Sequence, residues 1–467
     1  MMASIALKEA RSLLRDGRLW TLGLVLVLLF VAMLTTASIQ RNAAERERSQ
    51  VERVARQQWD NQGDKNPHRA AHFGMYAFKP QSLLSSVDPG VDSYVGQAMW
   101  LEPHKRNMAL FSPAADATPS IGLGPFTPAF VLLVLVPLLI AVLGHSTITQ
   151  ERESGTLRML HACGMDGRSL LVGKWIGITL ALFIVLLPIS LVSTWMLSNE
   201  HYGGALAALG LALLAYYIIW VGATVLVSVH CNSSRMALLV LTALWVAWVF
   251  LVPRISASVV DRWAPLPTGT AFWQGIGHDI QNGLPGDGSA ADRMKAFDAK
   301  LMVDNGVSRL EDLPFGANAK RRLYRDSYST KVHQLHFKRL WSAQFHQQKL
   351  LNWMSFISPY GPMGTISTAM AGTDLAHRQH FEMAAEAYRE KFTTRMDEWD
   401  LASTKGVTSF EDKYAGNAQW QAIPEWRYQA PGTGFAIEAS ALAWAQLLAW
   451  FTAVAGCLWL SARRLNP

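Results

Sequence analysis

Several histidines in this sequence are spaced so that one face of a helix could present them to a metal ion. The three groups are His68 with His72, His333 with His336, and Asp374 with His377 and His380. Imidazole nitrogens are common ligands of zinc and related metals, but no cysteine accompanies these histidines. Histidines on the surface of amphipathic helices explain the same spacing more simply. The sequence therefore predicts no metal site.

Acid–base and nucleophilic chemistry find little support in the sequence. Asp397, Glu398 and Asp400 cluster around Trp399, a pattern that we interpret as a solvated helix face rather than a catalytic pair. A nucleophile elbow would need a serine between a strand and a helix, and the sequence shows no such pattern. We therefore assign no catalytic residue and expect that the chain is not an enzyme on its own.

One segment superficially resembles a phosphate-binding loop, because Gly167 and Gly173 precede Lys174. The two glycines are one residue too far apart, and Trp175 stands where a serine or threonine would bind magnesium. No strand precedes the segment. The chain is therefore expected to bind no cofactor itself.

The overall composition indicates a membrane protein rather than a set of soluble domains. Of 467 residues, 50% are hydrophobic and only 16% are charged. The apolar residues gather in six runs, each close to the length of about 20 residues that crosses a bilayer. The predicted membrane-spanning segments are residues 19–39, 126–148, 170–197, 205–229, 236–252 and 436–460. The predicted fold class is an all-α, polytopic membrane protein.

The placement of lysine and arginine predicts the orientation of these spans. Basic residues concentrate in residues 1–18, in the loop 149–169 and in the tail 461–467, which share one side if six spans alternate. The short loop Ser198–Gly204 on the other side has none, as the positive-inside rule expects. Both termini are therefore expected in the cytoplasm. This topology also explains the net charge of +7, so no nucleic-acid partner is expected.

Two long polar regions, residues 40–125 and 253–434, are then extracytoplasmic. None of the three cysteines lies in them, which excludes a disulfide framework there. In the second region, Phe381, Ala385 and Phe392 recur at helical spacing, and a longer amphipathic pattern covers Lys320–Phe356. No convincing strand pattern appears. The second region is therefore predicted to be a mainly helical extracytoplasmic domain.

The loop between the second and third spans carries the sharpest motif. It contains Glu151, Arg152, Glu153, Ser154, Gly155, Thr156 and Leu157, and Gly173 and Lys174 open the next span. This segment resembles the permease subunits of bacterial ABC-2-type ATP-binding-cassette transporters, in which the corresponding loop is the coupling helix. The resemblance implies that the seven residues contact the ATPase subunit and pass its ATP-driven closure to the membrane helices.

The resemblance extends to both ends of the chain. The amphipathic residues 1–18 are similar to the interfacial N-terminal helix of the family. Ser358–Tyr360 and Ala371–Asp374 are similar to a bacterial subgroup with a large extracytoplasmic insert of unknown function. The family implies a bacterial inner-membrane protein that works with two ATPase subunits and a second permease copy or paralogue. It also implies contact with lipids and a periplasmic partner, and export or outward force rather than uptake.

The last span carries a stripe of small residues, Ala441, Ala445, Ala449 and Ala453. Such a stripe permits close helix packing, either inside one subunit or at a dimer seam. An alternative from another class also stays open, in which the chain is a membrane-anchored sensor or scaffold with an extracytoplasmic binding domain. A sensor would need no ATP-hydrolysing partner, and that difference separates the two hypotheses.

Overall fold

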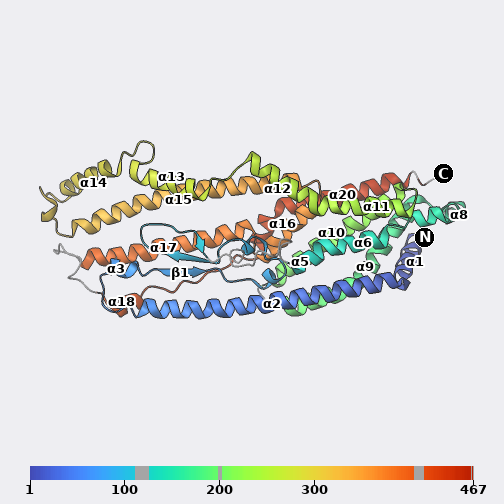
Figure 1. Cartoon of the computed structure of the whole chain (residues 1–467), viewed down its shortest axis with the longest axis horizontal. Helices are drawn as coiled ribbons and strands as arrows, with labels where there is room; N and C mark the ends of the chain where they lie inside the picture. Colours follow the sequence, from blue (N-terminus) through green and yellow to red (C-terminus); the bar gives the residue numbers. More distant parts are fainter. Residues whose placement is uncertain (111–125, 198–201, 404–414, 464, 466–467) are drawn as a thin grey trace.

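The computed structural model describes residues 1–110, 126–197, 202–403, 415–463 and 465. The chain forms a long rod, with a bundle of apolar helices at one end and a mostly helical arm at the other (Figure 1). Both chain termini lie at the end of the bundle that is farther from the arm. Two predicted loops lie partly outside the described residues, at 111–125 and at 198–201.

Six helices in the described part of the chain are long and apolar enough to cross a membrane, as predicted. They are α2 (Gly17–Asp60), α5 to α7 (Pro128–Phe130, Val136–Gly144 and Thr149–Glu153), α9 (Gly167–Leu197), α10 (Gly203–His230), α11 and α12 (Ser234–Val246 and Val252–Trp263) and α20 (Ala441–Ala462). Their apolar sides share one core, in which Tyr216 and Trp220 are fully buried. The predicted fold class, an all-α polytopic membrane protein, is confirmed.

A π-helical turn interrupts two of the spans, at Val131–Leu135 and at Ala247–Leu251. In each case a proline follows within the first two residues of the next helix, Pro137 or Pro253. Proline donates no backbone hydrogen bond and its ring crowds the preceding turn, and a wider turn relieves that conflict. The helix that contains the predicted span 236–252 therefore continues through Pro253 and ends at Trp263.

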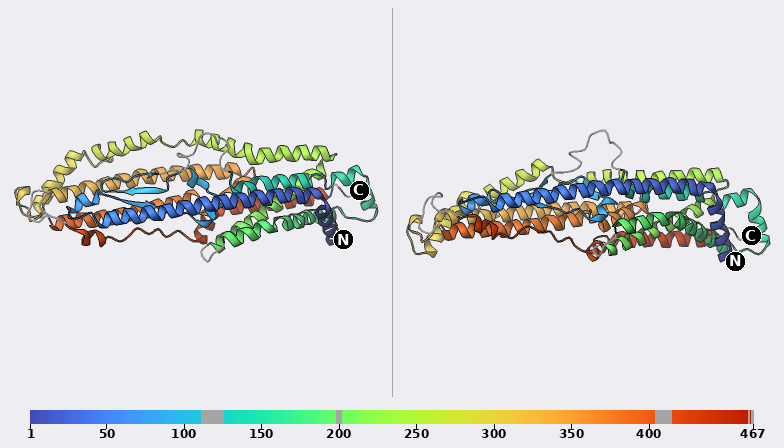
Figure 2. Two further views of the ribbon diagram at one scale, coloured as in Figure 1. Left: turned by 60° about the horizontal axis from the view of Figure 1, so that its bottom comes forward. Right: turned by 90° about the horizontal axis from the view of Figure 1, so that it is seen from below.

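The arm consists of long helices that lie side by side along the axis of the rod (Figure 2). Helix α2 alone has 44 residues, about 66 Å at 1.5 Å per residue, so it continues from the bundle along the arm. The other helices of the arm are α3 (Pro67–Ala71), α13 (Gly269–Asn282), α14 (Ala290–Asp304), α15 (Ala317–Ser355), α17 (Leu375–Ser403) and α18 (Asn417–Gln421). Two further helices, α16 (Tyr360–Ala371) and α19 (Thr433–Ala439), pack into the core of the bundle.

A small antiparallel sheet lies among these helices, and the sequence did not predict it. Its strands are β1 (Met75–Phe78), β2 (Ala98–Leu101) and β3 (Ala109–Leu110), in the order β1-β2-β3. Met75 pairs with Leu101, and Ala98 pairs with Leu110. The strands belong to the first long polar region, and strands of two to four residues are too short to show a period of two in the sequence.

The arm has its own core, separate from that of the bundle. Phe381, Ala385 and Phe392 are buried along one face of α17, as the helical spacing predicts. They pack near Trp59 at the far end of α2, whose indole N–H donates to the carbonyl of Trp420 at 2.9 Å. These contacts join α2, α17 and α18 into one unit.

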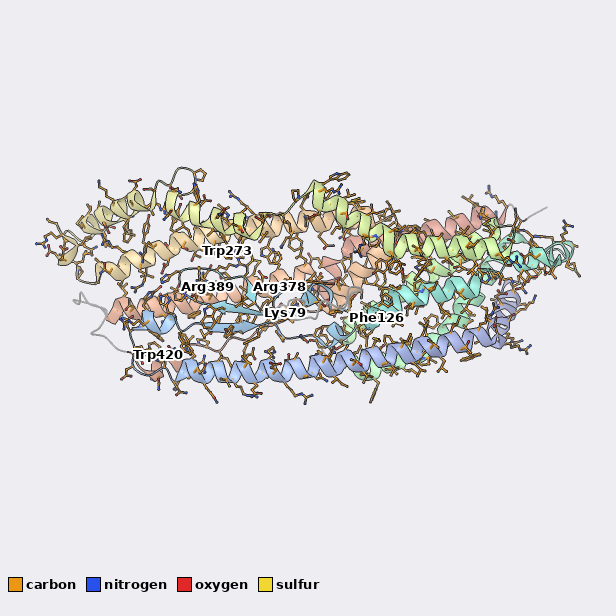
Figure 3. The ribbon with its side chains drawn as sticks, in the orientation of Figure 1. Lys79, Phe126, Trp273, Arg378, Arg389 and Trp420 are labelled. Carbon is orange, nitrogen blue, oxygen red and sulfur yellow. The ribbon has the colours of Figure 1, made fainter. Side chains whose placement is uncertain are left out.

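Three buried cations inside the arm are paired with acidic side chains. The Lys79 ammonium, 5% exposed, lies 2.6 Å from a carboxylate oxygen of Asp92. On α17, the Arg389 guanidinium pairs with Glu386, three residues earlier, and the Arg378 guanidinium pairs with Glu382, four residues later. Figure 3 shows the three basic residues in the middle of the arm. Pairing offsets the cost of removing each charge from water.

The first helix, α1 (Met2–Arg15), packs across the side of the bundle against α9. Two glycines of α9 make this contact close. A Cβ atom on Gly173 would lie 2.8 Å from the Cβ of Ile5, and one on Gly177 would lie 2.7 Å from the carbonyl oxygen of Ala6. The amphipathic N-terminal helix is therefore seated on the third span.

Candidate functional site

The predicted coupling segment forms a bent pair of short helices, which we call the elbow (residues 149–164). It consists of α7 and of α8 (Thr156–Ala162), joined at Gly155. Gly155 has a φ of 78°, a left-handed conformation that side chains other than glycine seldom adopt. The elbow lies at the end of the rod opposite the arm, beside both termini (Figure 1).

Glu151 points inward from α7 and joins four helices. Its carboxylate lies 3.2 Å from the ammonium of Lys174 on α9 and accepts a hydrogen bond from the hydroxyl of Thr156 on α8. Lys174 is only 5% exposed and also pairs with Glu9 of α1 at 2.7 Å. Because a buried charge requires such partners, this cluster holds α1, α7, α8 and α9 together.

Arg152 and Glu153 bond to the ends of the fourth and fifth spans. Arg152 donates to the carbonyls of Val229, at 2.8 Å, and of Cys231, where α10 ends. The carboxylate of Glu153 accepts from the backbone N–H and the hydroxyl of Ser234, both at 2.8 Å, where α11 begins. Helix ends carry unpaired backbone groups, so a cation at the C-terminus and an anion at the N-terminus both stabilise them.

The other residues of the elbow lie on an inner or an outer face. The hydroxyls of Ser154 and Thr156 bond to each other at 2.9 Å, and Leu157 packs against the core of the bundle. The outer face of α8 presents Met159, which is 68% exposed, and Cys163, which is also exposed. Leu157 and Leu160 lie three residues apart on the inner face, and that spacing could have located the outer face.

The alanine stripe of α20 lies on the outside of the bundle. Ala441, Ala445 and Ala453 are exposed and Ala449 is half-buried, whereas Leu447 faces the core. The stripe therefore does not pack inside the subunit. Its contact with a second copy stays a prediction.

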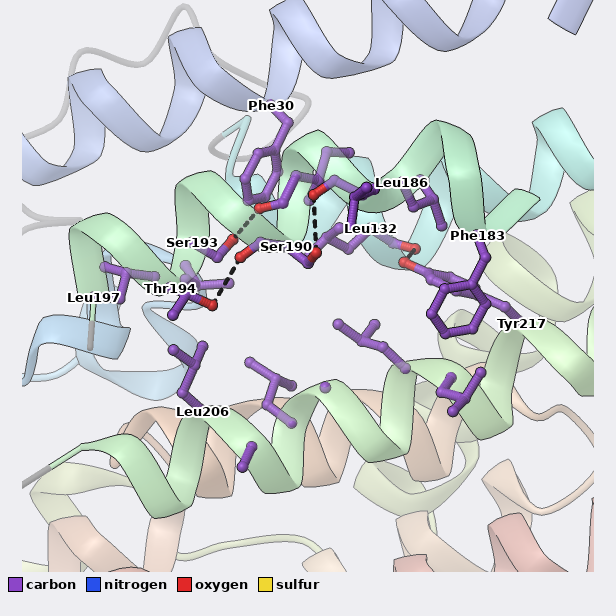
Figure 4. A pocket seen from close by; sticks show the side chains of 18 of the residues that line it. Phe30, Leu132, Phe183, Leu186, Ser190, Ser193, Thr194, Leu197, Leu206 and Tyr217 are labelled. Atoms are coloured by element: carbon purple, nitrogen blue, oxygen red, sulfur yellow. Dashed lines mark hydrogen bonds between the residues drawn. The ribbon is translucent and has the colours of Figure 1, made fainter. Parts of the chain in front are cut away.

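A crevice of about 410 Å³ opens between α9 and α10 in the bundle (Figure 4). Its lining is mostly apolar and includes Phe30, Phe183 and Leu206. The hydroxyls of Ser193 and Thr194 in its wall donate to backbone carbonyls one turn earlier in α9. Because those polar groups are already bonded, the crevice offers an apolar surface to whatever enters it.

The prediction of a solvated acidic face on α17 is wrong for two of its three residues. Asp397 and Asp400 are 6% and 1% exposed, and only Glu398 faces solvent. The Arg322 guanidinium of α15 makes an ion pair with Asp400 and lies 3.7 Å from a carboxylate oxygen of Asp397. The two carboxylates are therefore structural charges that join α15 to α17.

The three histidine groups have different outcomes. In two of them, one ring nitrogen of each histidine is engaged by another side chain or by the backbone. His333 bonds to the Ser329 carbonyl, His336 to Asp279, His377 to Asp374 and His380 to Tyr428. In the first group, His68 and His72 meet a third histidine, His104, from the turn after β2. His104 lies 32 residues after His72 in the sequence, and only the fold brings the two rings together. No helical spacing could therefore have indicated His104.

Two family models match this chain. The model of the ABC-2 family transporter protein matches residues 102–271, which contain the second to fifth spans and the elbow. The model described as domain of unknown function (DUF3526) matches residues 270–429, in the arm. No curated protein matches the chain. The chain therefore carries a membrane region of the ABC-2 transporter family, in a multi-pass membrane protein with a domain of unknown function before its last span.

Proposed function

We propose that this chain is a permease that couples ATP hydrolysis by a separate ATPase subunit to export or to outward conformational work. One observation carries the proposal. The elbow bonds through Glu151, Arg152 and Glu153 to the ends of several membrane helices, while the outer face of α8 is open. A docking surface that is fixed to the spans in this way can pass on a movement imposed from outside.

In the proposed cycle, the ATPase subunits approach each other when they bind ATP and push on α8. Because α7 is bonded to α9, α10 and α11, the push displaces these spans together instead of bending the loop. The π-helical turns at Val131–Leu135 and Ala247–Leu251 are places where two spans can bend. The crevice between α9 and α10 would change its shape as the spans move.

ATP and Mg²⁺ would be bound by the partner. The segment that superficially resembles a phosphate loop is the beginning of α9, and its lysine, Lys174, is buried. Lys174 already pairs with Glu9 and Glu151. This lysine is thus engaged as a structural cation, and its side chain is not presented to a nucleotide.

The proposed location is the inner membrane of a bacterium, with both termini, α1 and the elbow in the cytoplasm. The arm is then periplasmic, where it would receive substrate or contact a periplasmic partner. Two ATPase subunits and a second permease copy or paralogue complete the proposed complex. The exposed alanine stripe of α20 is a surface on which that second permease would pack closely.

Affinity purification of the tagged chain from its native membranes in a mild detergent tests the coupling proposal. We expect a stoichiometric ATPase subunit in the eluate, together with vanadate-sensitive ATP turnover. A chain that repeatedly purifies without an ATPase and without turnover would support a membrane-anchored sensor or scaffold instead.

A further inference from the structure

Three histidines of the arm point their ring nitrogens at one another. The Nε2 atoms of His68 and His72 are 3.2 Å apart, and those of His72 and His104 are also 3.2 Å apart. One ligand nitrogen from each ring lies within 4.8 Å of the other two. His68 is buried, His104 is half-buried and His72 is exposed, so the cluster opens to solvent on one side.

These nitrogen–nitrogen distances match those between two imidazole ligands of one metal ion. Zinc binds imidazole nitrogen at about 2.0–2.1 Å in tetrahedral geometry, which places two ligand nitrogens about 3.3 Å apart. The observed 3.2 Å lies close to that value for both pairs. Two of the three nitrogen–nitrogen edges of a three-histidine site are therefore already in place.

A carboxylate lies in hydrogen-bond contact behind one of the rings. The Nδ1 atom of His104 is 2.7 Å from Asp326 on α15, whereas the Nδ1 atom of His68 is 3.5 Å from Asp397 on α17 and makes no hydrogen bond to it. A carboxylate that accepts the Nδ1–H of a histidine leaves Nε2 with a free lone pair and makes it a better metal ligand. Asp326 thus favours the tautomer of His104 in which Nε2 points, unprotonated, into the cluster.

The backbone around these rings is held in place. The side chain of Asn66 caps α3, accepting from the N–H of His68 at 2.9 Å, and donates to the buried Asp400 at 2.8 Å. His104 has a φ of 72° and is the one residue other than glycine with a positive φ among the described residues. The hydroxyl of Ser329 donates to the carbonyl of His104 at 2.8 Å. Strain of this kind persists where the surroundings require it, as at ligand sites.

Hydrogen bonds between the three rings explain their arrangement less well than a shared metal ion does. The Nε2 atom of His72 has two nitrogen neighbours at 3.2 Å, and a single N–H has only one good direction for donation. A metal ion shared by the three rings would account for both close neighbours of His72 at once.

We propose that His68, His72 and His104 bind one divalent metal ion of the zinc class, with the fourth position open to solvent. Zn²⁺, Cu²⁺ and Ni²⁺ share the preference for imidazole, whereas Mg²⁺ and Ca²⁺ prefer oxygen ligands. The ion would link α3 to the turn after β2 and, through Asp326, to α15. Three protein ligands leave a fourth position for water or another small ligand, unlike the closed arrangement of structural zinc sites.

Metal titration of the full chain, purified in detergent with a tag that lacks histidine and stripped with a chelator, tests the proposal. Calorimetry with Zn²⁺ should show one ion bound per chain, and Mg²⁺ should show none. His72→Ala and His104→Ala should each weaken Zn²⁺ binding at least 100-fold. Asp326→Asn should weaken it about 10–100-fold, as for other carboxylates behind metal-bound histidines.

The matched control is His278→Ala, since the His278 side chain on α13 is 68% exposed and lies outside the cluster. This variant should bind Zn²⁺ like the parent chain. The visible spectrum of Co²⁺ bound to the parent chain gives a second readout that needs no variant, and a tetrahedral spectrum is expected. Absence of saturable Zn²⁺ binding, or unchanged stoichiometric binding in both His72→Ala and His104→Ala, would overturn the proposal.

Discussion

Arg322→Met is expected to lower the free energy of unfolding of the arm by about 3–5 kcal/mol, the cost of breaking a buried ion pair from one side. Arg322 is 4% exposed, and its guanidinium lies between Asp400 and Asp397. Methionine fills a similar volume but leaves both carboxylates without their cation. Thermal unfolding of the purified chain, followed by tryptophan fluorescence, should show a midpoint lowered by roughly 10 °C.

Arg325→Met is the matched control for this experiment. Arg325 lies one turn further along α15 and is exposed, so its replacement should change the midpoint by little. Arg322→Lys should give an intermediate result, because lysine restores the charge but not the planar fork of donors. Equal midpoints for Arg322→Met and Arg325→Met would contradict the assignment of Asp397 and Asp400 as structural charges.

Met159→Glu is expected to reduce ATP turnover in the purified complex at least tenfold. Met159 is the large apolar side chain on the outer face of α8, and a carboxylate there would be buried without a partner in any docked complex. Hot-spot residues, which cluster near the centre of an interface, contribute about 2 kcal/mol or more, which corresponds to roughly a 30-fold change in affinity. The measurement is vanadate-sensitive ATP hydrolysis per permease, together with the amount of ATPase subunit retained.

Met383→Glu provides the control, because Met383 is 57% exposed on α17 in the arm, far along the rod from the elbow. The same chemical change should leave both the retained ATPase and its turnover unaltered. If Met159→Glu keeps a full complement of ATPase and full turnover, α8 is not the docking surface.

The six spans could be predicted because each depends on a local property, a run of apolar residues of sufficient length. The helical face of α17 around Phe381 and Phe392 was predictable for the same reason, since its spacing is visible within a few turns. The ends of the helices were harder to predict. The span at 236–252 continues to Trp263 because a π-helical turn accommodates Pro253, and that accommodation leaves no mark in the hydrophobic pattern.

The parts that the sequence did not reveal depend on contacts between distant residues. Asp397 and Asp400 read as solvated because their cation, Arg322, lies on another helix. His104 joins His68 and His72 only through the turn after β2. Likewise, the motif in residues 151–157 located the elbow, but not the direction of each side chain. Arg152, for example, bonds to the carbonyl of Val229, 77 residues away.

Cross-linking from the native Cys163 tests the proposed coupling most directly. Cys163 is exposed at the end of α8, Cys231 is buried, and Cys457 lies in the membrane-spanning α20. A photoactivatable maleimide on Cys163, irradiated in native membranes, should capture an ATP-binding subunit, and Cys163→Ser should abolish that product while leaving any Cys457 product. Full labelling of Cys163 with no ATP-binding subunit captured would contradict the account.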